Sequence, residues 1–155
     1  MIRRAVVAAV AGVLLAATGL ATPATAATPT CSGASCDGQV VTTTNCKDSR
    51  AYAIDGITVT GMALALWYSP SCHAMWGDYQ LTGSGTAWIS MFGIAPYGGS
   101  GEARTLYSVN VSGPTTDIST TLFNSTQSIE LCWNQQPGLP PADGSAGPYG
   151  CTRWR

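Results

Sequence analysis

The amino-acid sequence predicts an all-β protein, a small disulfide-stapled antiparallel β-sandwich or barrel with a Pro/Gly-rich loop near the C-terminus. Several segments alternate apolar and polar residues, which is the pattern of a half-buried strand. Gly and Pro turn signals separate these segments, and no stretch of ten or more residues combines helical periodicity with capping residues. The chain also carries six cysteines, an even number that suits a disulfide framework.

The clearest predicted strand spans residues 62–68. Its apolar face consists of Met62, Leu64, Leu66 and Tyr68. Because successive side chains in a strand point to opposite faces, Trp67 is expected to face away from the core. The other expected strands are 57–60, 72–76, 86–92, 104–111, 118–123 and 129–133. Short strands of this kind, separated by turns, are typical of small sandwiches and barrels.

The first 26 residues have the three parts of a secretory signal peptide. Arg3 and Arg4 form a basic start, residues 5–21 are mostly apolar, and Ala24-Thr25-Ala26 is a small-residue cleavage site. A membrane anchor is the alternative, but the apolar run is short for a membrane span and a cleavage site follows it. We therefore expect removal of residues 1–26 and a single secreted β domain over residues 27–155, without stable membrane insertion.

Composition narrows the possible partners. The chain has 155 residues, a formal net charge of -1 and only 10% charged residues. This length allows one domain, and this charge provides no basic surface for nucleic acid. A charged fraction well below the roughly 25% of average domains suits an exported protein that is rich in Ser and Thr. We expect a monomer with an extracellular ligand.

The six cysteines are Cys31, Cys36, Cys46, Cys72, Cys132 and Cys151. A metal site is the competing interpretation, but no C-x2-C pair occurs and the only histidine, His73, adjoins Cys72. We therefore expect disulfides and no metal or other cofactor, with fifteen pairings open. Cys132 and Cys151 bracket a loop, residues 137–150, that contains four prolines and four glycines. A disulfide there would pin the C-terminal tail and contribute on the order of 3 kcal/mol.

Two stretches combine cysteines with a specific spacing. The first reads CSGASC over residues 31–36 and is followed by Cys46, and the second reads YSPSCHAMW over residues 68–76. Together they resemble the YjfA-like family, which comprises secreted domains of unknown function from Gram-positive bacteria, mainly actinomycetes. The resemblance covers about residues 31–92. The chain departs from the family pattern at Trp67, where an Arg is usual, and at Gly77-Asp78, where a basic residue is common.

The resemblance implies a sensing or binding role, because some family members form the outer end of membrane proteins with a regulator-like cytoplasmic part. It brings no catalytic residues. The family cysteines correspond to Cys31, Cys36, Cys46 and Cys72. The resemblance therefore implies that these four pair among themselves and that Cys132 pairs with Cys151.

Catalytic motifs are weak in this sequence. A Ser-His-Asp triad would depend on His73, which is expected in a strand, and no G-x-S-x-G turn presents a serine. Glu130 should face outward from its strand, and Glu102 falls in a Gly-rich loop. Five aspartates lie beside Gly or turn-forming residues, where Asp normally supports the turn: Asp37, Asp48, Asp55, Asp78 and Asp143. No pair of carboxylates stands out, so we predict no catalytic residues.

Aromatic residues are the stronger functional indication. We expect Trp67, Tyr97 and Trp154 as possible ligand contacts, because exposed rings bind carbohydrate or peptide without needing charge. The alternative is that these rings are packing lids over the edges of a small domain. The sequence thus favours a non-enzymatic extracellular binding or interaction protein. A small extracellular hydrolase, a protease inhibitor with residues 137–150 as its bait loop, and a structural envelope protein are the alternatives.

Overall fold

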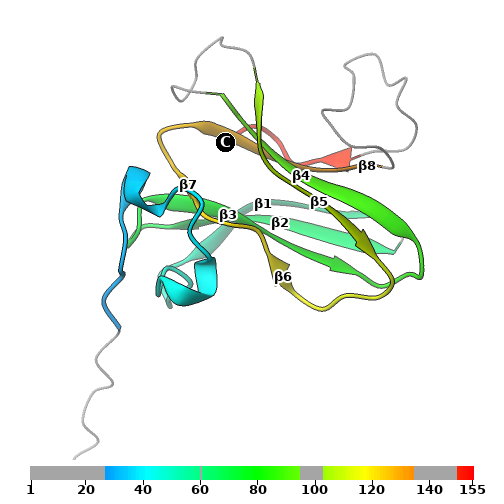
Figure 1. The fold of residues 1–155 in the computed structure, drawn as a ribbon, viewed down its shortest axis with the longest axis horizontal. Helices are drawn as coiled ribbons and strands as arrows, with labels where there is room; N and C mark the ends of the chain where they lie inside the picture. Colours follow the sequence, from blue (N-terminus) through cyan, green and yellow to red (C-terminus); the bar gives the residue numbers. More distant parts are fainter. Residues whose placement is uncertain (1–26, 60, 95–102, 135–149) are drawn as a thin grey trace, which may run out of the picture.

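The computed structural model describes residues 27–59, 61–94, 103–134 and 150–155. The predicted signal peptide, Tyr97 and residues 137–149 of the predicted loop lie outside the described residues. Two antiparallel sheets pack face to face, with a small N-terminal lobe at one end (Figure 1). Within the described ranges there is no α-helix, and three disulfides are present. The predicted all-β, disulfide-stabilised fold class is confirmed.

The first sheet contains five strands. Three long strands lie side by side: β1 (Tyr52–Val59), β2 (Met62–Ser69) and β3 (Ala74–Leu81). Two short strands, β6 (Ile118–Ser119) and β7 (Phe123–Asn124), both pair with the free edge of β3. The sheet therefore consists of three long antiparallel strands, with two short strands paired one after the other along the outer edge of β3.

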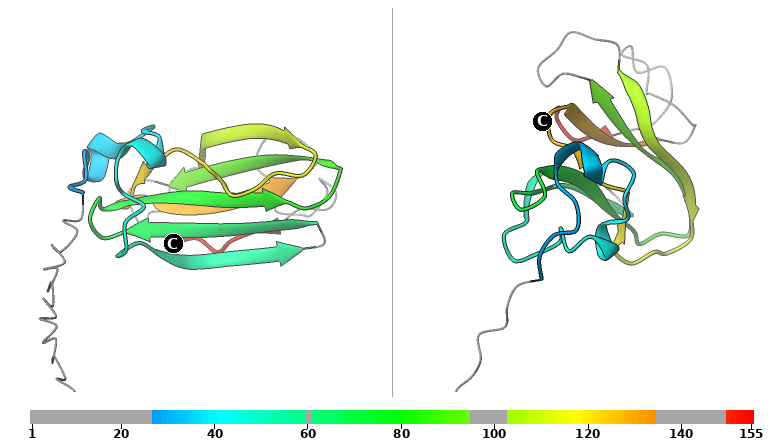
Figure 2. Two further views of the ribbon diagram at one scale, coloured as in Figure 1. Left: turned by 90° about the horizontal axis from the view of Figure 1, so that it is seen from below. Right: turned by 60° about the vertical axis from the view of Figure 1, so that its left-hand side comes forward.

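The second sheet has the order β5 (Arg104–Ser112), β4 (Thr86–Ile94), β8 (Ser128–Asn134) and β9 (Gly150–Cys151). The chain changes sheets between β3 and β4, and the two layers lie one above the other in the right-hand view of Figure 2. Beyond β9 the C-terminal residues continue alongside β8, where the main chains of Ile129 and Arg155 exchange hydrogen bonds of 2.8 and 3.0 Å.

The main core lies between the sheets. The first sheet contributes Met62, Leu64, Leu66, Met75, Tyr79 and Leu81, and the second contributes Ala87, Ile89, Met91, Val111, Ile129 and Leu131. The predicted apolar face of residues 62–68 is thus confirmed, with Tyr68 packed at its margin. Close approach of the two sheets depends on Gly77, because a Cβ atom there would lie 2.7 Å from the side chain of Leu131.

A second, smaller core joins the N-terminal lobe to the outer face of the first sheet. The lobe contains two 3-10 turns, η1 (Gly33–Cys36) and η2 (Val41–Thr43). The buried residues of this second core are Cys36, Val41, Cys46, Cys72, Ala74, Trp76 and Leu122. Disulfides join Cys31 to Cys36 and Cys46 to Cys72. The second of these ties the lobe to the turn before β3.

Three predicted strands differ from the structure. The strand expected over 57–60 is the end of a longer strand that begins at Tyr52, because Asp55 and Gly56 pair with β2 instead of forming a turn. The strand expected over 72–76 begins only at Ala74, because the preceding segment turns: the Cys72 main-chain N–H donates to Ser69 Oγ at 3.2 Å, and His73 has a left-handed φ of 48°. His73 is therefore a turn residue and not a strand residue. The strand expected over 118–123 breaks into β6 and β7, because its middle pairs with the lobe, where Leu122 N–H donates to the Gln39 carbonyl at 2.8 Å.

Two of the aspartates assigned to turns lie within strands instead. Asp55 is in β1, next to a shift of register against β2. Asp78 is in the interior of β3, opposite Ala65. Both carboxylates bind cations that arrive from distant parts of the chain, Asp55 from Arg153 and Asp78 from Lys47. Those partners were not apparent from local sequence.

Candidate ligand-binding groove

A groove of about 460 Å³ lies on the outer face of the first sheet. Its lining includes two small side chains of β2, Ala63 and Ala65, which alternate away from the main core. Thr58 of β1 and Gln80 of β3 line it on either side, each paired in register with Ala63. The groove exists because small residues occupy the middle of this face while larger ones surround it.

Trp67 lines one end of this groove. Its ring is parallel to that of Trp76, its partner across β2 and β3, with ring centroids 6.1 Å apart and planes at 10°. Trp76 is fully buried in the second core, whereas Trp67 is partly exposed. Trp67 faces away from the main core, as its strand phase predicts, and it presents an aromatic surface that Trp76 supports from behind.

Polar side chains complete the lining, and Asp78 organises them. Its carboxylate forms an ion pair with Lys47 Nζ at 2.9 Å and accepts hydrogen bonds from Trp76 Nε1 at 3.0 Å and Ser119 Oγ at 2.6 Å. Asp117 also lines the groove. The Asp78 contacts fix the orientation of one carboxylate in the groove and pair it with the ammonium of Lys47.

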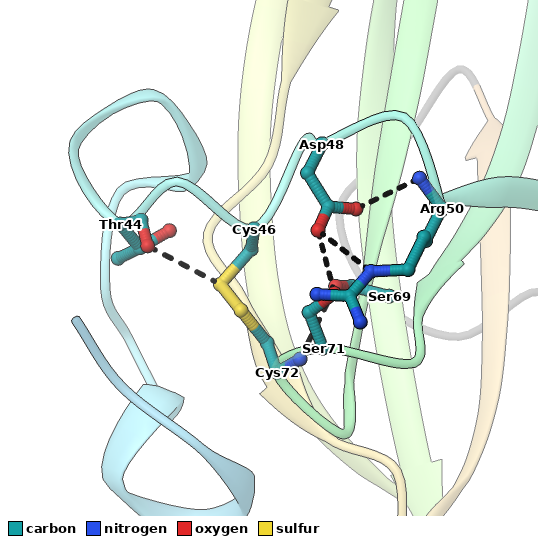
Figure 3. Close-up of polar contacts among 7 residues, drawn as sticks. All are labelled: Thr44, Cys46, Asp48, Arg50, Ser69, Ser71 and Cys72. Atoms are coloured by element: carbon teal, nitrogen blue, oxygen red, sulfur yellow. Dashed lines mark hydrogen bonds and ion pairs between the residues drawn. A yellow bond between two sulfur atoms is a disulfide. The ribbon is translucent and has the colours of Figure 1, made fainter. Parts of the chain in front are cut away.

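The position of Lys47 depends on the residues on either side of it. Cys46 is bonded to Cys72, and the Asp48 carboxylate accepts hydrogen bonds from Ser71 Oγ and from the main-chain N–H and Nε of Arg50 (Figure 3). The hydrogen bond from Ser71 is the main cause that holds the pKa of Asp48 below its usual value. The lobe is thus attached to the sheet immediately before and after Lys47, which places its ammonium at the groove.

Of the other two predicted ligand contacts, the structure describes Trp154 alone, and Trp154 does not join Trp67. Trp154 is 37% exposed but belongs to the C-terminal segment beside β8, in the other sheet, and does not line the groove. Tyr97 lies outside the described residues. Sequence reasoning missed Lys47, Gln80 and Asp117. One signal was available, because Ala63, Ala65 and Trp67 share the phase opposite to the apolar face.

A second cavity, of about 580 Å³, lies at the end of the sandwich that holds Tyr52 and Tyr68. These two rings meet edge to face with centroids 5.8 Å apart. Ile54, Met75, Ser125 and Arg155 also line it. The Arg155 guanidinium already contacts the Asp55 carboxylate at 3.3 Å, so its charge is compensated within the protein.

His73 and Glu130 are the two ionisable groups whose chemistry could serve catalysis. Nδ1 of His73 lies 3.5 Å from the Tyr68 hydroxyl, and its carbonyl accepts a hydrogen bond from Ser125 Oγ. Those contacts orient a turn and are not those of a nucleophile and its base. Burial raises the pKa of Glu130 to about 7. Glu130 lies on β8 of the second sheet, away from the groove.

The fold and the groove define a disulfide-stabilised β-sandwich with an aromatic groove on one sheet. The chain belongs to the family described as protein of unknown function DUF2690, whose model matches residues 34–131, more than half of its length. That region contains every groove-lining residue and leaves out the Cys132–Cys151 disulfide. No curated protein and no solved structure is significantly similar to the chain.

The three disulfides indicate the kind of environment in which the protein is stable. All six cysteines are paired, and Cys132 is joined to Cys151, the pair that the family resemblance implies. Disulfides of this number suggest an oxidising extracellular environment. Among the described residues, no helix has the length and apolar character needed to span a membrane.

Proposed function

We propose that this protein is a secreted, non-enzymatic binding module that holds a carbohydrate in the groove beside Trp67. The observation that carries the proposal is the combination of an aromatic surface, a floor of small side chains and oriented polar groups in one groove. The apolar C–H face of a sugar packs on an indole, and its hydroxyls bond to carboxylate and amide groups. A volume of about 460 Å³ lies within the range of small-molecule sites.

A carbohydrate suits the groove better than a peptide does. Extended peptides commonly bind by adding a strand to a free sheet edge, whereas this groove lies across the face of the sheet, over β1 to β3. Its hydrogen-bonding groups are side chains, namely Thr58, Gln80 and Asp78. Lys47 pairs with Asp78 within the groove, and Asp117 adds a second carboxylate. Carboxylate, amide and hydroxyl side chains beside an indole suit a polyhydroxylated ligand.

Several wider features belong to the same proposal. In this proposal residues 1–26 direct export and are then removed. The mature protein is a monomer and a member of the YjfA-like group from Gram-positive bacteria. Ligand binding requires neither His73 nor Glu130, since neither lines the groove. A net charge of -1 gives no reason to expect nucleic acid as a partner.

A glycan array followed by titration of tryptophan fluorescence tests this function. We expect binding of at least one neutral glycan and a loss of at least about tenfold in affinity for Trp67→Ala, which removes the stacking surface. Trp154→Ala is the matched control, because it deletes an exposed indole outside the groove, and it should bind normally. Ala65→Gln, which fills the floor while leaving the Trp67–Trp76 stack intact, should also abolish binding.

Three results would contradict the proposal. Full binding by both Trp67→Ala and Ala65→Gln would place the ligand elsewhere. Selective binding of peptides and no glycan would overturn the carbohydrate class. Turnover of a bound glycan that disappears in Glu130→Gln or His73→Ala would favour the hydrolase alternative.

A further inference from the structure

The four cysteines of the N-terminal lobe and the adjoining turn form one cluster. The Sγ atoms of Cys31, Cys36, Cys46 and Cys72 all lie within 4.8 Å of one another. In particular, Cys31 Sγ lies 3.7 Å from Cys46 Sγ, although the two belong to different disulfides. Two sulfurs at that distance are in van der Waals contact. The Cys31–Cys36 and Cys46–Cys72 bonds are therefore neighbours with no side chain between Cys31 Sγ and Cys46 Sγ.

Access to the cluster from solvent is uneven. Cys36, Cys46 and Cys72 are fully buried, whereas Cys31 is partly exposed. Thiol–disulfide exchange requires a thiolate to reach a sulfur of the bond that it attacks. An external thiol can therefore begin at Cys31 alone.

We propose that this cluster is a thiol-reactive site, at which a low-molecular-weight thiol is the substrate and Cys31 is the entry point. The thiolate attacks Cys31 Sγ, a mixed disulfide forms, and Cys36 leaves as a thiolate. A second thiol attacks the sulfur of the bound thiol, which yields the external disulfide and a Cys31 thiolate. The two external thiols are oxidised by two electrons, and the Cys31–Cys36 bond is reduced by two.

The contact with Cys46 then allows an internal step. The Cys31 thiolate attacks Cys46 Sγ, a Cys31–Cys46 bond forms, and Cys72 leaves as a thiolate that takes up a proton. This step changes no oxidation state overall. It replaces a bond between residues 26 apart in sequence by one between residues 15 apart. The shorter loop loses less closure entropy than the longer one, by about twofold in the equilibrium constant, so loop entropy does not oppose the internal step.

The internal step would alter how the lobe is attached. Cys46–Cys72 is the disulfide that ties the lobe to the turn before β3, whereas a Cys31–Cys46 bond lies entirely within the lobe. Cys72 packs in the second core with Trp76, and Cys46 precedes Lys47 at the groove. The cluster therefore connects the partly exposed Cys31 with a covalent tie beside the groove. This inference does not depend on which ligand the groove binds.

Disulfide mapping tests the proposal on the intact protein. The protein is treated with reduced glutathione, quenched with acid and alkylated with N-ethylmaleimide, and its peptides are mapped without reduction. We expect molecules with one disulfide reduced to carry label on Cys36 and Cys72 and to contain a Cys31–Cys46 peptide, in at least about a tenth of the total. Label restricted to Cys31 and Cys36 would overturn the internal step. Cys132–Cys151, which contributes no sulfur to the cluster, is the internal reference and should label only on its own residues.

A matched pair of variants tests the same exchange without added thiol. Cys36→Ser leaves Cys31 as a permanent free thiol beside Cys46, and we expect label on Cys72 in a substantial share of molecules. Cys31→Ser leaves Cys36 free, and we expect label on Cys36 alone. Label on either Cys46 or Cys72 in Cys31→Ser would show a route through Cys36 and overturn the role of Cys31. Label confined to Cys31 in Cys36→Ser would overturn the exchange.

Discussion

Trp67 and Trp76 stack across adjacent strands with their ring planes only 10° apart, yet one is partly exposed and the other fully buried. The pair thereby joins the groove to the second core. Trp76 Nε1 donates to the Asp78 carboxylate at 3.0 Å, and the same carboxylate holds Lys47. The indole that a ligand would touch thus rests on a ring whose own hydrogen bond organises the polar side of the groove.

Asp78→Ala should lower the free energy of unfolding by about 2 kcal/mol, because it leaves the buried Trp76 Nε1 without its acceptor. Lys47→Ala removes the other half of the ion pair but should cost less than about 1 kcal/mol, since Lys47 is 44% exposed and Asp78 only 14%. Urea denaturation of the two variants measures both effects. Equal losses of unfolding free energy in the two variants would show that the stabilising contact is the ion pair and not the hydrogen bond from Trp76 Nε1 to Asp78.

Gly77→Ala should destabilise the protein by about 1–3 kcal/mol, because the new Cβ would lie 2.7 Å from Leu131, which is fully buried and cannot move aside. Gly85→Ala is the matched control. A Cβ there has nothing within 4 Å, so its stability should stay equal or rise by up to about 1 kcal/mol. Thermal unfolding separates the two, and a neutral Gly77→Ala would mean that the sheets can move apart freely.

Stability should fall with rising pH because of Glu130. Burial raises its pKa in the folded protein to about 7 from an ordinary value of 4.5. The folded state therefore binds this proton more tightly than the unfolded state does. The resulting stability is fully present below about pH 4.5 and is lost as the pH rises through about 7.

Glu130→Gln should abolish that loss, because an amide does not ionise. At about pH 8 the variant should be more stable than the original protein by on the order of 1 kcal/mol, a figure reduced for solvent screening because the side chain is only half-buried. Urea denaturation at about pH 4.5 and pH 8 measures the difference, and Asp117→Asn is an exposed control. Parallel pH profiles for the original protein and Glu130→Gln would contradict the assignment.

Removal of the Cys132–Cys151 disulfide should cost about 3 kcal/mol, since the bond joins residues 19 apart in sequence. The double variant Cys132→Ala, Cys151→Ser should nevertheless keep both sheets. Thr152 still exchanges two hydrogen bonds with the main chain of Leu131, at 2.9 and 3.0 Å. Circular dichroism and urea denaturation test both statements. A loss below about 1 kcal/mol would show that the non-covalent contacts of the tail hold it without the disulfide.

Local pattern predicted the strands well where each strand pairs regularly. Alternation over residues 62–68 correctly placed Leu64 and Leu66 in the main core and Trp67 on the opposite face. It failed at residues 72–76, where the Cys72 N–H bonds to Ser69 Oγ in a tight turn, and at residues 118–123, where Leu122 bonds to Gln39 of the distant lobe. An alternating pattern describes a regular strand, and it indicates neither the turn at Ser69 nor the pairing with Gln39.

The groove was predicted only in part. Trp67 stood out because a large ring on the outward phase of an apolar strand is conspicuous. Lys47 and Asp117 did not, since they lie in segments without regular secondary structure and reach the groove through the lobe and the loop before β6. Trp154, which was proposed from its position after the last cysteine and not from a strand pattern, lies beside the other sheet.

The sequence by itself determined the all-β class and the inward and outward faces of its best strand, because these follow from the period of a pleated chain. Only the tertiary structure decided which distant groups meet. Docking of the lobe brings Lys47 to Asp78 and Cys31 Sγ to within 3.7 Å of Cys46 Sγ. Such contacts depend on how separate segments pack in three dimensions, and the local order of residues does not encode them.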